Sequence, residues 1–142
     1  MIPPFIDFGK NAADLRFVVV DMICRFVIQE HTTSDGVHWD LMLEQEGVLV
    51  TFRLEEEPAQ ALTHEVRAVK IFDHPLRFLT YEGPVQKGAG KVRIADSGTY
   101  QNRDRSDGLW GLGLDGVVLK GDYTLTRIVG DDWRFAPRKP SP

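Results

Sequence analysis

From Phe26 onward the chain is a series of short segments rich in valine, isoleucine, phenylalanine, tyrosine and threonine, separated by glycine, proline, aspartate or serine. None of these segments has a convincing helical period, and their spacing is typical of antiparallel β structure. We expect strands over residues 26–31, 37–45, 48–54, 66–72, 77–82, 90–95, 116–120, 122–128 and 132–136. Helix is expected to be short, within residues 58–65.

This number of strands in a small chain predicts an all-β, mainly antiparallel fold, because an open sheet would leave long exposed edges. We therefore expect a small closed or nearly closed β-barrel with little helix. At 142 residues and 42% hydrophobic composition, the chain is long enough for one sizeable core. The barrel is assigned to residues 25–136, with an N-terminal leader or extra strand at 1–24 and a flexible basic tail at 137–142.

The pairing of the first strands can be predicted from their polar and apolar positions. If His31 opposes His38, then Gln29 opposes Asp40, and the other face of both strands is mostly apolar. A two-residue turn at Glu46-Gly47 fixes the next hairpin independently. In that register Arg53 lies opposite Asp40. One polar face is therefore predicted to hold Gln29, His31, His38, Asp40 and Arg53.

Two neutral imidazoles and a carboxylate on a rigid sheet suit a divalent transition metal, and we expect manganese or zinc. Gln29 is a candidate for orienting a ligand, and Arg53 for binding an anionic oxygen. Two alternatives remain open. Arg53 and Asp40 form a plain surface salt bridge beside exposed histidines, or the residues form the facial triad of a non-haem iron oxygenase.

The charge balance limits the partners that the protein can have. With 17 basic and 21 acidic residues, for a net charge of −4, the chain is not expected to coat duplex nucleic acid. Its one cysteine gives no sign of an oxidising compartment, so a cytoplasmic location is expected. The apolar run from Phe17 to Cys24 is interrupted by Asp21 and is too short to span a membrane.

Several blocks of sequence resemble one known family. They are FVIQEH at 26–31, HWDLMLE at 38–44, DHPL at 73–76, YEG at 81–83, DSGTY at 96–100, LKGDYTL at 119–125 and WRF at 133–135. In this order they resemble the 3′-phosphoesterase domain of bacterial ATP-dependent DNA ligase D. The similarity covers about residues 25–136.

The resemblance implies a small β-barrel with a manganese-dependent site that trims nucleic-acid 3′ ends, by diester and then monoester cleavage. By position, it implies that His31, His38 and Asp40 are metal ligands and that His74 contacts phosphate or is catalytic. Gln29 matches a glutamine that lines the site. The sequence contains no polymerase or ligase segment, so separate ligase or polymerase proteins are the expected partners at those ends.

Two positions depart from the family pattern. Met42 stands where the family has an arginine, and Phe78 stands where it has a tyrosine. We expect Arg53, predicted on the same face as Met42, to compensate for the missing arginine. The alternative function is a catalytically weak or inactive metal-binding module that binds nucleic-acid ends.

Overall fold

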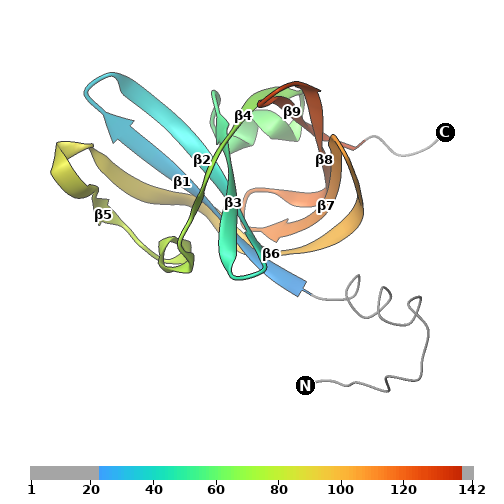
Figure 1. Cartoon of the computed structure of the whole chain (residues 1–142), viewed down its shortest axis with the longest axis horizontal. Helices are drawn as coiled ribbons and strands as arrows, with labels where there is room; N and C mark the ends of the chain where they lie inside the picture. Colours follow the sequence, from blue (N-terminus) through green and yellow to red (C-terminus); the bar gives the residue numbers. More distant parts are fainter. Residues whose placement is uncertain (1–22, 139–142) are drawn as a thin grey trace, which may run out of the picture.

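The structure, a computed structural model, describes residues 23–138 (Figure 1). Its strands are β1 (Ile23–Thr33), β2 (Gly36–Gln45), β3 (Val48–Leu54), β4 (Val66–His74), β5 (Gly83–Pro84), β6 (Lys91–Ser106), β7 (Leu109–Gly116), β8 (Lys120–Val129) and β9 (Asp132–Pro137). Within these residues the order in the sheet is β1-β2-β3-β4-β9-β8-β7-β6-β5, and β1 also pairs with β6. Eight antiparallel strands thus close into a barrel, with β5 added outside, and the predicted fold is confirmed.

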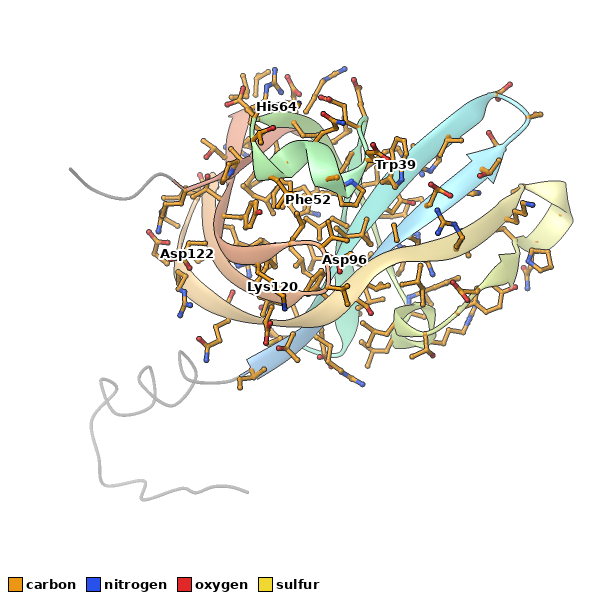
Figure 2. The ribbon with its side chains drawn as sticks, turned by 180° about the vertical axis from the view of Figure 1, so that it is seen from behind. Trp39, Phe52, His64, Asp96, Lys120 and Asp122 are labelled. Atoms are coloured by element: carbon orange, nitrogen blue, oxygen red, sulfur yellow. The ribbon has the colours of Figure 1, made fainter. Side chains whose placement is uncertain are left out.

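The inside of the barrel is filled by the apolar face of the predicted strand pairs. Ile28 opposes Leu41, which opposes Phe52, and all three side chains are 0% exposed. Figure 2 shows Phe52 among the side chains between the walls of the barrel. Burial of each such side chain contributes about 1.5–3 kcal/mol. The alternation of strand residues therefore fixes which face of β1, β2 and β3 points inward.

The predicted strand at 77–82 is wrong. This region begins with a 3-10 helix, η2 (Leu76–Leu79), in which the N–H of Phe78 donates to the carbonyl of Pro75 at 3.1 Å. Leu76 and Leu79, three residues apart, both face the outside of the barrel wall and pack there on an apolar cluster. A 3-10 turn brings residues at this spacing to one side, whereas a strand would point them to opposite sides.

The predicted strand at 116–120 is also wrong, and one strand was missed. β7 occupies Leu109–Gly116, and Val117–Leu119 form the connection to β8. No strand was predicted over residues 96–115, and the glycines of β7 allow neighbouring side chains to approach its backbone closely. A methyl group on Gly111 would collide with the carboxylate of Asp104, and one on Gly113 with the guanidinium of Arg103. β6 also runs eleven residues beyond its predicted end at 95, to Ser106.

The short connection after β7 is held by one buried carboxylate, that of Asp96 on β6, labelled in Figure 2. Asp96 is 2% exposed. Its Oδ1 accepts from the backbone N–H groups of Ser97, Val117 and Val118, and its Oδ2 accepts from that of Leu119, at 2.8–3.1 Å. Asp96 therefore accepts the hydrogen bonds of the backbone N–H groups in this connection, which would otherwise have no partner.

The remaining expectations concern the short helices and the chain ends. The predicted short helix is present as η1, a 3-10 helix at Pro58–Leu62. No helix within residues 23–138 has the length and apolar character needed to cross a membrane. The predicted leader falls outside the described residues except for Ile23 and Cys24, which begin β1. Of the predicted tail, Pro137 ends β9 and Arg138 pairs with Asp104 at 3.2 Å.

Candidate metal centre

The candidate site lies on the outer face of the barrel, on strands β1, β2 and β3. The predicted register is present: His31 opposes His38, Gln29 opposes Asp40, and Asp40 opposes Arg53. Residues on these strands alternate between the inner apolar face and this outer face. The structure therefore brings together the five predicted polar residues from three strands.

His31, His38 and Asp40 place their donor atoms next to one another. Nδ1 of His31 lies 3.0 Å from Nε2 of His38, and that nitrogen lies 3.5 Å from Oδ2 of Asp40. One ligand atom from each residue falls within 4.8 Å of the other two. Two imidazole nitrogens and a carboxylate oxygen at this separation fit the donor set of a divalent transition metal such as manganese or zinc.

A loop on the far side of the site orients His31. Nε2 of His31 donates to the backbone carbonyl of Ala89 at 2.7 Å, which leaves the lone pair of Nδ1 facing His38 and Asp40. A backbone carbonyl that fixes the tautomer in this way is a common partner of metal-binding histidines. Ala89 was not predicted as a site residue. Its only signal in the sequence is the pair of flanking glycines in Gly88-Ala89-Gly90, which lies in the connection between the paired strands β5 and β6.

Arg53 lies at the edge of the three converging residues. Its Nε donates to Oδ1 of Asp40 at 3.1 Å, and 39% of its side chain is exposed. The ion pair considered as an alternative therefore exists. However, Asp40 is 4% exposed and the two histidines are half-buried, so the group differs from a plain surface salt bridge.

Gln29 contacts the segment that covers part of this face, residues 75–90, here called the crossover segment. Its Nε2 donates to the carbonyls of Phe78 and Tyr81, at 3.0 and 3.1 Å. These bonds attach the crossover segment to β1 beside the site. A role for Gln29 in orienting a metal ligand stays a prediction.

His74 is the last residue of β4. Its Nδ1 lies 2.8 Å from the hydroxyl of Thr51, which is on the same outer face of β3. The ring stacks on that of Phe72, with centroids 4.8 Å apart, and meets the edge of Phe78. His74 is thus beside the three converging residues and does not belong to them.

Burial keeps two of these histidines neutral. Burial lowers the pKa of His38 below its usual value, and the neighbouring charge of Asp40 only partly opposes this effect. Burial also lowers the pKa of His74, again against the charge of Asp40, while Arg53 lowers it further. Both rings are therefore neutral at neutral pH, the state in which imidazole binds a metal or accepts a proton.

The family model described as the DNA Ligase D 3′-phosphoesterase domain matches residues 29–127 of this chain. The chain belongs to this family. The match includes every predicted site residue and all of the strands β2 to β7, so the resemblance proposed from short blocks is confirmed.

Relatives from three bacteria are similar to this chain over about three quarters of its length. The multifunctional non-homologous end joining protein LigD of Mycobacterium bovis is 38% identical over 115 residues, which are 76% of this chain and 15% of that protein. The protein of the same name in Mycolicibacterium smegmatis is 35% identical over 123 residues, 77% of this chain and 16% of that protein. The protein of the same name in Pseudomonas aeruginosa is 30% identical over 113 residues, which are 74% of this chain and 13% of that protein. The chain therefore spans about one-seventh of the length of these relatives.

At the two positions that depart from the family pattern, the structure has an apolar cluster. Met42 is 1% exposed and packs with Val27, Leu49 and Leu79, and Phe78 covers their edge. This outer apolar cluster fixes the crossover segment onto the barrel wall. At the positions where the resemblance leads us to expect an arginine and a tyrosine, Met42 and Phe78 thus help to hold the crossover segment in place and offer no hydrogen bond to a phosphate.

The loop that orients His31 allows a direct test. Gly90 has φ +92°, and a methyl group there would collide with the carbonyl of Thr32. We expect Gly90→Ala to displace Ala89 and to weaken manganese or zinc binding by about 10- to 100-fold, the usual cost of losing a partner of a metal ligand. Isothermal titration calorimetry measures this loss.

Gly88→Ala is the matched control for that variant. Gly88 also has a positive φ, +69°, but no atom lies within 4 Å of the added methyl group. Its metal affinity is expected to stay close to that of the wild type. Equal losses in the two variants would show that general strain of the loop, rather than the position of Ala89, determines metal affinity.

Proposed function

We propose that the chain is a manganese-dependent phosphoesterase that acts on 3′ ends of nucleic acid in DNA repair, cleaving phosphodiesters and then the remaining phosphomonoester. The observation that carries this proposal is the convergence of His31, His38 and Asp40, with ligand atoms within 4.8 Å of one another. Membership of the DNA ligase D 3′-phosphoesterase family supports a phosphoesterase role in DNA repair. Zinc also fits the donor set.

Each residue of the site would have its own role in this reaction. His31, His38 and Asp40 would hold a divalent metal, which supplies Lewis-acid polarisation of a phosphate oxygen and an acidified water. Arg53 would donate hydrogen bonds from its exposed guanidinium to a second phosphate oxygen. With Nδ1 of His74 engaged by Thr51, its Nε2 would exchange a proton with an oxygen of the transferring group.

The test is hydrolysis of a primer-template whose primer ends in a 3′-phosphate. The proposal expects release of inorganic phosphate with manganese and none after chelation with EDTA. The same duplex with a 5′-phosphate in place of the 3′-phosphate serves as the control and should remain intact. If manganese does not stimulate phosphate release from the 3′ end, the proposed activity is wrong.

Arg53 is expected to replace the arginine that the family has at the position of Met42. Loss of a hydrogen bond to a charged group costs about 1.5–3 kcal/mol, so Arg53→Ala should lower kcat/KM for the 3′-phosphate about 10- to 150-fold. Arg67→Ala is a matched control, because Arg67 is also a paired arginine but bonds Glu55 and Asp132 on the surface. An unchanged rate in Arg53→Ala would refute the compensation by Arg53.

A second function is favoured by the outer apolar cluster around Met42 and Phe78. Without two polar partners for phosphate, the protein would be a weak or inactive module that binds metal and nucleic-acid ends. Such a module would bind manganese and a 3′-phosphorylated duplex but release no phosphate. In either case, we propose that separate ligase or polymerase proteins act on the same ends.

A further inference from the structure

Phe72 is an exposed aromatic ring beside the candidate metal centre. Among residues 23–138 eight large apolar side chains are exposed, and Phe72 is the one aromatic side chain in that set, at 73%. Single exposed aliphatic residues are ordinary on protein surfaces. An exposed ring next to a polar site needs a separate explanation, because a flat apolar surface at such a place is suited to stacking.

The ring is held by His74 and is open on its other side. The rings of Phe72 and His74 are stacked, with centroids 4.8 Å apart and an interplanar angle of 26°. β4 pairs with β9 only over Val66–Val69, so within the described chain no strand borders Phe72 on that edge. One face of Phe72 is therefore covered by a site residue, while its surroundings leave room for a ligand.

Most of the unpaired cations of the described chain lie close to Phe72 in the sequence. In the described part of the chain, five lysine or arginine side chains have no carboxylate within 4.0 Å: Lys70, Arg77, Lys87, Lys91 and Arg105. Four of these five lie between residues 70 and 91, on the same stretch as Phe72, His74 and the crossover segment. Free positive charges next to a stacking surface are typical of sites that bind a single nucleic-acid strand.

We infer that Phe72 stacks on the base of the 3′-terminal nucleotide, while the free cations of residues 70–91 hold the phosphates that precede it. The inference rests on the proposed function, since it places the terminal phosphate at His31, His38 and Asp40. It also defines the substrate more closely. The preferred end is a nucleotide with an accessible base, and recognition is independent of sequence because every base has a stacking face.

The test compares two oligonucleotides that both end in a 3′-phosphate, one with a normal terminal nucleotide and one with an abasic terminal nucleotide. Phe72→Ala should raise KM for the normal end about 5- to 100-fold, with little change in kcat, and leave the abasic end unaffected. Phe72→Trp should retain wild-type KM. Val129→Ala is the control, since Val129 is 69% exposed on β8 and lies outside the site.

Binding of the same two oligonucleotides in EDTA, measured by fluorescence anisotropy, gives a readout that does not need turnover. Preference of the wild type for the normal end, lost in Phe72→Ala, supports the inference even if no phosphate is released and the proposed activity fails. Equal losses of affinity for the normal and the abasic end in Phe72→Ala would overturn the inference. So would a change in oligomeric state in Phe72→Ala without a change in base preference, because Phe72 would then contact a second protein chain.

Discussion

Replacing His38 by alanine is expected to lower manganese-dependent release of 3′-phosphate more than about 100-fold. Loss of a residue that only hydrogen-bonds a metal ligand already lowers metal affinity or activity about 10- to 100-fold, and loss of a ligand itself should cost more. His38 lies between the other two donors, 3.0 Å from His31 and 3.5 Å from Asp40. Its removal would leave one imidazole and one carboxylate, too few ligands to hold the metal tightly. Phosphate release and calorimetric metal titration should fall together.

His64→Ala is the control for this experiment. His64 is an exposed histidine that bonds Glu56 at 3.0 Å and follows η1, where Figure 2 labels it. This variant should keep both manganese binding and phosphate release. If His38→Ala bound manganese as tightly as the wild type, the three converging residues would not be the metal site.

The second large effect concerns folding stability. Asp96→Ala should lower the free energy of unfolding by about 3–5 kcal/mol, because four backbone N–H groups lose their acceptor in a buried place. Total stabilities of single domains are about 5–15 kcal/mol, so this loss is a large fraction of the whole. Urea denaturation followed by tryptophan fluorescence measures it.

Asp115→Ala provides the comparison, since Asp115 lies on the neighbouring strand β7 and has a side chain that is 75% exposed. Its one ion pair, with Lys120, is at the surface, and such pairs contribute about 0–1 kcal/mol. The free energy of unfolding of Asp96→Asn should lie between those of Asp96→Ala and Asp115→Ala, because the amide nitrogen of asparagine cannot accept a hydrogen bond from the N–H of Leu119. Similar midpoints for Asp96→Ala and Asp115→Ala would mean that solvent replaces the buried carboxylate.

The sequence predicted the register of β1, β2 and β3 because two independent constraints agree there. Alternation of polar and apolar residues allows one pairing of His31 with His38, and the turn at Glu46-Gly47 allows one pairing in the next hairpin. A slip by one residue would exchange the inner and outer faces. Where both constraints act, each site residue could be placed before the structure was known.

The errors occurred where long-range contacts override local preference. Nothing in residues 77–82 shows that Leu76 and Leu79 meet an apolar surface made by β1, β2 and β3. The strand β7 was not predicted, and its glycines are needed because side chains from β6 cross over them. The contacts of Ala89 with His31 and of Phe72 with His74 were not predicted for the same reason. A backbone carbonyl and an apolar ring have no chemical signature until the fold places them beside His31 and His74.

The position of His31, His38 and Asp40 on the outer face of the barrel has a consequence for protein engineering. Along β2, Leu41 faces the barrel interior, whereas Asp40 and Met42 face outward. Exchanging residues on the outward side therefore alters the chemistry without repacking the main core. An arginine installed at position 42 would disturb only the small cluster under the crossover segment. Every second residue of these strands can thus be changed on the outer face while the inner face keeps the barrel folded.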